Sequence, residues 1–503
     1  MKMLLRESRS VAKKFASLSV TVLCFFSGAG SASSLFAEEE PKPALAAKVD
    51  EIFAPWDRAG SPGCAVAVIK DNVTVYSRGY GTASIELGAP ITPTTVFYLA
   101  SVSKQFTATA VALLEEQGKL SFDDDVRRYV PELPAYDRPI TIHHLLHHTS
   151  GIRDFLELWG LTGEDGENLL TEQRTLDLIG AQKELNFSPG ERYEYCNSGY
   201  FLLGLIVKRV TGQSLREFAA VNIFGRLHMT HTLFNDSFSE IVYDRATGYR
   251  LSRGSGFSTV RTRYPVGSGG VLSSVEDLAI WDHNFYDNKL GQGGSALINK
   301  LQTRGKLNSG SEISYACGLQ VLNYRGVPMV EHDGANAGFR TELMRFPDQH
   351  LSIIVLSNSG AANPKELAQK IADYCLGDRL TAELGGMDEK KSVSATNKPP
   401  ETVSALPPSS FADYDGTYYS PELGVSYTIL PGEREFIVQI GSVSSFRIFR
   451  FSGELFGVKN RPSTSFKFTR NADGKVDGFT LEGGRVHHLR FKKTDGATAA
   501  PAG

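Results

Sequence analysis

A serine and a lysine that lie three positions apart can together perform nucleophilic chemistry. Ser101 and Lys104 have this spacing, and on a helix they would share one face. A serine hydroxyl is a weak nucleophile until a neighbouring base takes its proton, and a partly desolvated lysine has a lowered pKa that suits this task. The pair therefore predicts a nucleophile and its base, although Ser-x-x-Lys alone also occurs by chance on many helices.

The residues around this pair predict the helix that would position it. An apolar lead-in, 97–100, precedes Ser101, and Gly118 follows the segment as a stop signal. Between them, apolar residues recur at helical spacing, at Phe106, Ala110, Leu113 and Leu114. A helix that opens on Ser101 would point the backbone N–H groups of its first turn at any anion that forms there.

A tyrosine and an asparagine form a second candidate group. Tyr195 and Asn197 follow the turn 188–190 and precede an apolar helix, 201–210. Two residues with this spacing in an extended segment project to one side. A phenol is an acid/base candidate and an amide orients its partners by hydrogen bonds. A packed aromatic ring and a helix cap are the alternative interpretation.

A histidine and a glycine form the third candidate group. A strand is predicted over 327–331, and His332-Asp333-Gly334 follows it. Two further strands are predicted over 339–346 and 351–358. The motif would therefore lie beside the end of a sheet, although His-x-Gly alone is weak evidence.

Composition bounds the class of protein. A chain of 503 residues predicts two domains. Its 53 basic and 56 acidic residues give a net charge of −3, which does not favour a nucleic-acid partner. Beyond the N-terminus the cysteines are few and far apart, which predicts buried thiols rather than a disulfide scaffold or a zinc site: Cys64, Cys196, Cys317 and Cys375.

The N-terminus has the pattern of an export signal. A basic stretch precedes an apolar run over 15–26, and small residues follow. We therefore predict a signal peptide over 1–37, no membrane span after its cleavage, and a secreted or periplasmic protein of bacterial type. An uncleaved membrane anchor is the alternative, but the apolar run is short for a span.

Three other segments complete the first domain. Four histidines, 143, 144, 147 and 148, favour a hydrogen-bonded turn over a metal site. Residues 153–186 are polar and predict a surface excursion near a cleft. The glycine-rich segment 264–274 enters a helix capped at Ser274, without the context of a dinucleotide loop.

The C-terminal part is predicted as an all-β domain. A Lys-, Ser- and Pro-rich linker over 386–408 precedes about eight short strands within 409–493, which suggest a small antiparallel barrel or sandwich. A disordered tail is predicted over 494–503.

Together the motifs resemble one family. Ser101-Val102-Ser103-Lys104, Tyr195-Cys196-Asn197 and His332-Asp333-Gly334 stand in order, with a Leu-Leu-x-His-Thr-Ser-Gly turn at 145–151. They are similar to the serine hydrolases that include class C β-lactamases, D-alanyl-D-alanine carboxypeptidases, D-aminopeptidases and related esterases. The resemblance implies an α/β (α+β) β-lactamase/transpeptidase-like domain over 41–385, with an antiparallel sheet flanked by helices and an all-helical part. Residues 411–491 more loosely resemble a lipocalin-like barrel.

The resemblance also implies roles. Ser101 would be the nucleophile, Lys104 and Tyr195 would share proton transfer, and Asn197 would orient Lys104. His332 would line the leaving-group side. The oxyanion would sit between the backbone N–H groups of Ser101 and Ala335, next to Gly334. No metal or organic cofactor is implied.

Two positions depart from the family pattern. Cys196 stands where a serine is usual, and His332 stands where most β-lactamases carry a lysine. Histidine is only partly charged near neutral pH, so this departure shifts the substrate class and leaves the chemistry intact.

We therefore predict an exported serine hydrolase that acts on a small-molecule or peptide substrate, as a D-aminopeptidase or D-Ala carboxypeptidase does. A carboxylesterase is the alternative, and a β-lactamase or a non-catalytic binding protein is less favoured. The barrel would select substrates, stabilise the protein or form a homodimer.

Overall fold

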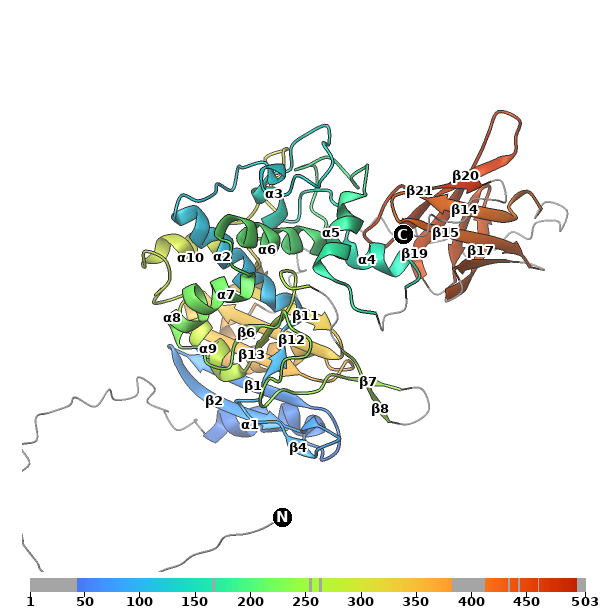
Figure 1. Ribbon diagram of the computed structural model, residues 1–503. Coiled ribbons are helices and arrows are strands. Elements are labelled where there is room, and N and C mark those ends of the chain that lie inside the picture. Colours follow the sequence, from blue (N-terminus) through green and yellow to red (C-terminus); the bar gives the residue numbers. More distant parts are fainter. Residues whose placement is uncertain are drawn as a thin grey trace, which may run out of the picture. The chain divides into compact units, whose positions relative to one another are not determined.

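The computed structural model describes residues 43–164, 168–252, 256–261, 265–381, 412–432, 435–441, 444–459 and 461–494 (Figure 1). The predicted signal peptide and linker lie outside these residues. The predicted tail does too, except for Thr494, which ends a strand.

The central sheet joins strands from both ends of the first domain, so that blue and orange strands lie together in Figure 1. Its order is β10-β11-β12-β13-β1-β2, and every neighbouring pair is antiparallel. The strands are β1 (Cys64–Lys70), β2 (Val73–Tyr80), β10 (Gln320–Tyr324), β11 (Val327–Asn336), β12 (Phe339–Phe346) and β13 (Leu351–Ser357). The strand predicted over 339–346 is confirmed with these bounds.

Strand β11 is longer than predicted. The prediction ended at Glu331, whereas the strand continues through His332 and Gly334 to Asn336. Glycine and asparagine disfavour strands locally, but pairing with β12, which matches Ala335 with Arg340, overrides that preference. The third motif therefore lies within a strand.

The two faces of the sheet are covered by different helices. Helices α1 (Pro43–Phe53) and α11 (Pro364–Leu376) pack with Val66 and Val68 of β1 in one core. Ala65 and Ala67, which point the other way, belong to the core of α9 (Val275–His283) and the helical part. Because β1 alternates between two cores, it is buried on both faces.

The helical part carries the first two motifs. Its helices are α2 (Lys104–Glu116), α3 (Ile142–Leu146), α4 (Phe155–Leu161), α5 (Glu172–Gly180), α6 (Asn197–Thr211), α7 (Leu215–Ala219), α8 (Gly225–Leu227) and α10 (Ser295–Gln302). Short helical turns are η1 (Ala54–Trp56), η2 (Ala100–Ser103), η3 (Val126–Arg128), η4 (Ala220–Phe224), η5 (Pro347–Gln349) and η6 (Gly377–Arg379).

Short strand pairs connect these elements. They are β3 (Thr82–Ser84) with β4 (Ala89–Pro90), β5 (Phe97–Tyr98) and β6 (Leu233–Phe234) with β9 (Val271–Ser273), and β7 (Tyr249–Leu251) with β8 (Phe257–Thr259). Ser274 caps α9 by accepting from the Asp277 backbone N–H, as predicted.

The prediction of a surface excursion over 153–186 is right only in part. This segment forms α4 and α5, and the Arg153 and Asp154 side chains are fully buried. These two buried side chains have polar partners, whereas Glu172, Gln173 and Asp177 of α5 are exposed, and hydropathy alone does not distinguish the two groups.

The C-terminal domain is a closed eight-stranded antiparallel barrel, which confirms the barrel prediction over the sandwich (Figure 1). Its strands are β14 (Gly416–Ser420), β15 (Val425–Pro431), β16 (Phe436–Ile440), β17 (Ser444–Ser452), β18 (Leu455–Val458), β19 (Arg461–Arg470), β20 (Val476–Gly483) and β21 (Leu489–Thr494). Its interior is packed with aromatic rings, among them Tyr414, Phe468 and Phe479. Residues 484–488 form the turn that connects β20 and β21.

In the described part of the chain, no helix combines the length and apolar character needed to cross a membrane. The four described cysteines are free thiols, and three of them are buried.

Candidate active site

Ser101 lies at a sharp junction between β5 and α2. The preceding Ala100 has φ 49°, a left-handed conformation that is costly for a residue with a Cβ. Gly334 of β11 packs against this turn, and a Cβ there would come within 2.4 Å of the Leu99 carbonyl oxygen. The close approach requires a glycine, and it brings the third motif to the serine.

Lys104 is fully buried beside Ser101. Its Nζ donates to Ser101 Oγ over 3.2 Å, to Asn197 Oδ1 over 3.0 Å and to the Ser268 carbonyl oxygen over 2.7 Å. Desolvation lowers the pKa of Lys104 to about 7, against the opposing effect of Asp154. A substantial fraction of neutral amine is therefore present near neutral pH, as a base requires.

Tyr195 forms another side of this group. Its ring centroid lies 4.7 Å from Lys104 Nζ, and its phenol is within the range in which Ser101 affects its pKa. Burial raises the pKa of Tyr195 well above its usual value, with the Ser101 contact acting in the opposite direction. The phenol is therefore protonated at neutral pH and can pass a proton on.

His148 supports the Tyr195 ring. The two ring centroids lie 4.3 Å apart, and the Cys196 backbone N–H donates to His148 Nδ1 over 3.1 Å. Burial holds the pKa of His148 well below its usual value. The Cys196 thiol donates to the Ile152 carbonyl oxygen, and burial raises its pKa to about 12, so this departure from the motif is a packed neutral thiol.

Asn197 begins α6 and is held by Asp154. Asp154 Oδ2 accepts from the Asn197 backbone N–H over 2.7 Å and from its Nδ2 over 2.9 Å. The amide oxygen is thereby turned toward Lys104, which donates to it. The helix-cap interpretation of Asn197 fails, since Cys196 occupies the N-cap position of α6.

His332 lies on β11, with its ring centroid 6.3 Å from that of Tyr195. Its Nδ1 lies 2.6 Å from the Asp333 carbonyl oxygen and its Nε2 lies 2.9 Å from Tyr315 Oη. These contacts assign the proton to Nδ1, with Nε2 accepting from the tyrosine. Desolvation lowers the pKa of His332 to about 4, so the imidazole is neutral at pH 7.

Gly334 and Ala335 lie where β11 has only one strand partner. The last pair between β10 and β11 is Gln320 with Glu331, and beyond it β11 pairs with β12 alone. Gly334 contacts the Ser101 turn through its backbone. The role of Ala335 as an oxyanion donor stays a prediction.

Sequence reasoning missed Asp154, Ser268, Tyr315 and Arg485. Ser268 lies in the glycine-rich segment and contacts Lys104 through its backbone carbonyl oxygen. Residue types in the sequence do not show which backbone carbonyl will accept such a bond. Asp154 lies three positions beyond the 145–151 turn, and this proximity is the signal that points to it. Arg485 belongs to the barrel and is separated from the other site residues by 150 positions or more, so no local pattern connects it.

The four histidines each have a local contact. Thr141 N donates to His144 Nδ1, and His147 Nδ1 lies 2.9 Å from the His143 carbonyl oxygen. Burial lowers the pKa of His144 and of His147 to about 4. Within the described ranges, no group of three or more His, Cys, Asp or Glu side chains is arranged to hold a metal ion.

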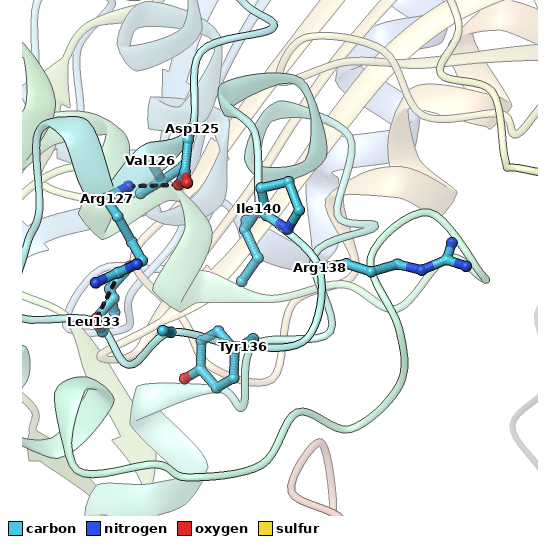
Figure 2. A pocket seen from close by; sticks show the side chains of 9 residues that line it. Asp125, Val126, Arg127, Leu133, Tyr136, Arg138 and Ile140 are labelled. Carbon is cyan, nitrogen blue, oxygen red and sulfur yellow. Dashed lines mark hydrogen bonds between the residues drawn. The ribbon is translucent and has the colours of Figure 1, made fainter.

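A small cavity of about 150 Å³ lies elsewhere, under the loop 125–140 (Figure 2). Arg127 Nε donates to the Leu133 carbonyl oxygen there, and Tyr136 Oη donates to the Gln182 carbonyl oxygen. All of its lining residues come from this loop, and none belongs to the site around Ser101.

Comparison with known protein families shows the family to which the chain belongs. The Beta-lactamase family matches residues 47–376, about two thirds of the chain. The chain therefore belongs to this family, as the three motifs predicted.

Two relatives of known name are similar to this chain over more than 300 residues. A D-aminopeptidase of Gluconobacter oxydans is 29% identical over 377 residues, which cover 74% of this chain and 66% of the relative. A D-aminopeptidase of Brucella anthropi is 30% identical over 319 residues, which cover 63% and 59%. The chain thus spans about six tenths to two thirds of the length of these relatives.

A solved structure shares the fold over most of the chain. The octameric penicillin-binding protein homologue from Pyrococcus abyssi superposes with a TM-score of 0.59 at 24% identity, and the match covers 90% of this chain and 99% of that one. At this identity the likeness concerns the fold.

Proposed function

We propose that this protein is a serine hydrolase that cleaves amide or ester bonds through an acyl-enzyme on Ser101. The observation that carries the proposal is the buried Lys104 amine, 3.2 Å from Ser101 Oγ, with a pKa lowered to about 7. A buried amine of this pKa accepts a proton near neutral pH, which an ordinary surface lysine does not.

In the acylation step, neutral Lys104 takes the Ser101 proton as Oγ attacks the carbonyl carbon of the substrate. The electron pair of the carbonyl π bond moves to its oxygen, which the backbone N–H groups of Ser101 and Ala335 would receive. One such donor typically contributes about 3 kcal/mol to the transition state.

Collapse of the tetrahedral intermediate breaks the bond to the leaving group, which needs a proton. Tyr195 supplies it from its phenol and regains one from the Lys104 ammonium. Because its pKa is raised, Tyr195 acts as a relay in its neutral form. In deacylation, water attacks the acyl carbon and gives up a proton to Tyr195 and Lys104. That proton passes to Ser101 Oγ as the bond between Oγ and the acyl carbon breaks, which releases the acid and restores neutral Lys104.

The neutral imidazole of His332 favours particular substrates. Most β-lactamases of the family carry a lysine here, whereas His332 provides no fixed positive charge for a carboxylate. We therefore infer an aminopeptidase acting on D-amino-acid peptides, rather than a carboxypeptidase or a β-lactamase. The names of the two D-aminopeptidase relatives support this substrate class.

A substrate panel tests this inference. We expect hydrolysis of D-alanine p-nitroanilide to exceed that of nitrocefin, with p-nitrophenyl butyrate reporting the intrinsic acyl transfer. Turnover of the ester alone would support the carboxylesterase alternative, and preferential turnover of nitrocefin would contradict the argument from His332.

Covalent labelling tests the nucleophile. A fluorophosphonate should add one adduct to the wild type by intact mass and none to Ser101→Ala. Ser103→Ala is the matched control, since Ser103 Oγ accepts from the Val271 backbone N–H and does not contact Lys104. An adduct that persists in Ser101→Ala would remove Ser101 from this role.

We also propose that the protein is exported, on the basis of the basic and apolar segments within 1–37. N-terminal sequencing of protein from a periplasmic or secreted fraction tests this, and an intact Met1 would contradict it.

A further inference from the structure

One turn of the barrel contacts the segments that position the candidate site. This barrel turn, residues 484–488, connects β20 and β21. Its backbone is held by the helical part: Asn186 Nδ2 and the Asp154 N–H both donate to the Arg485 carbonyl oxygen, over 3.0 and 3.3 Å. Arg153 Nε donates to the His487 carbonyl oxygen over 3.0 Å.

The Arg485 side chain points toward the site. Its Nη2 lies 3.4 Å from Asp154 Oδ1 and 3.5 Å from Glu157 Oε1. Its guanidinium carbon lies 5.7 Å from the Tyr195 ring centroid. The Arg485 side chain is 31% exposed, whereas Asp154 is fully buried, so the arginine covers a carboxylate that has no access to water.

The carboxylate under Arg485 is the one that orients Asn197. Asp154 uses Oδ2 for the two Asn197 donors and Oδ1 for Arg485 and the first turn of α4. A continuous series of contacts therefore runs from Arg485 through Asp154 and Asn197 to Lys104.

We propose that Arg485 is a positioning residue of the hydrolase site: it holds Asp154, and through it Asn197, so that the Lys104 amine faces Ser101. The proposal rests on the proposed function. On this proposal the barrel takes part in forming the active site, because it supplies the guanidinium that pairs with the buried Asp154 carboxylate.

The pKa of Lys104 distinguishes a positioning role of Arg485 from a purely structural one, because it depends on the charge of Arg485. The charged groups that act on Lys104 are Asp154 and Asp333, which raise its pKa, and Arg485, which lowers it. The other titratable groups around it are neutral at pH 7: His148, Cys196, Tyr195, Tyr200 and His332. Loss of the Arg485 charge should therefore raise the pKa of Lys104.

The barrel also provides a matched control. Glu422, in the connection between β14 and β15, forms a second ion pair with the helical part, 3.0 Å from Arg153 Nη1, and is 7% exposed. It is a buried ion-pairing residue on the barrel side of the same interface, and its carboxylate does not contact Asp154, Asn197 or Lys104.

The experiment compares Arg485→Gln, Arg485→Lys and Glu422→Gln in the full chain, with p-nitrophenyl butyrate from about pH 5 to about pH 10. For Arg485→Gln we expect the acid limb of kcat/KM to move to higher pH and kcat to fall about tenfold with little change in KM. Arg485→Lys should keep most of the activity and the limb, and Glu422→Gln should lower Tm without moving the limb.

An unmoved limb and unchanged kcat in folded Arg485→Gln would overturn the proposal. An equal shift in Glu422→Gln would do so as well, since it would show a general effect of the interface. The Lys104 pKa can also be followed by NMR with ¹³C-labelled lysine, assigned with Lys104→Arg. A raised pKa in Arg485→Gln would support the positioning role even if Ser101 proved unreactive, which separates the failure of this proposal from that of the proposed function.

Discussion

Both domains have apolar cores, but they differ in the polar side chains that they bury. The interior of the barrel is lined by aromatic rings, with Phe479 stacked on Phe491 at 4.5 Å. The first domain instead buries a lysine, an aspartate and an asparagine around Ser101, each held by hydrogen bonds. An apolar interior needs no partners, whereas each buried polar group does. The side chains proposed for catalysis therefore lie in the interior of the first domain. The barrel residue proposed to position them, Arg485, lies instead on the turn 484–488.

The largest effect should come from the buried lysine. Lys104→Ala should lower kcat about thousandfold, because a positioned base typically contributes 10²–10⁴-fold. Exposed Lys119, just beyond the same helix, is the matched control, and Lys119→Ala should leave turnover unchanged. Retained turnover in folded Lys104→Ala, measured with saturating ester, would contradict the role of Lys104 as the base. The buried polar groups of the first domain would then have no catalytic function that the barrel interior lacks.

A substitution in the barrel interior should affect stability instead. Phe479→Ala removes a ring that packs against Phe468 and Phe491, at a cost of about 3–5 kcal/mol. We expect a lower midpoint in denaturant unfolding and near-normal kcat at temperatures where the protein remains folded. A large loss of kcat with the barrel still folded would show that its interior takes part in catalysis.

Removal of the Asp154 charge should have an intermediate effect. Asp154→Asn keeps the shape but replaces a carboxylate that accepts two Asn197 donors, and a hydrogen bond to a charged group contributes about 1.5–3 kcal/mol. We expect a loss of about 30-fold in kcat, by steady-state kinetics. Asp282→Asn is a control for a buried ion pair elsewhere, since Asp282 pairs with Arg345; it should lower stability without this kinetic loss.

The pH dependence should reflect Lys104. Only its neutral form accepts a proton, so kcat/KM should rise as pH increases through about 7 and level off above it. Below that pH the fall should approach tenfold per pH unit. Tyr195, whose pKa is raised, should add no alkaline limb near neutrality. A profile that is flat through neutrality would contradict the assignment of Lys104 as base.

The smallest effect on this profile should come from His332. Since the imidazole is already neutral near pH 7, His332→Gln should leave the acid limb of kcat/KM in place, while KM changes by a few fold at most. Loss or displacement of the limb in this variant would assign the titration to His332 instead.

Local patterns decided much of the framework. Strands 64–70 and 73–80 were predictable because a continuous apolar run precedes Asp71 and Asn72 and a run with partial alternation follows them. Asp71 and Asn72 adopt the positive φ values of a tight turn. The barrel strands were predictable for the same reason. The extension of β11 through Gly334 was not, because pairing with β12 overrides what a glycine prefers locally.

By itself, the sequence determined the order of the three motifs and the types of their side chains, since residue chemistry and helical spacing are properties of neighbouring positions. Only the tertiary structure decided that Lys104 is desolvated, that His332 is neutral and that Arg485 of the barrel covers Asp154. Burial and charge depend on groups that lie hundreds of positions away in the chain, and no local pattern records which of them will meet.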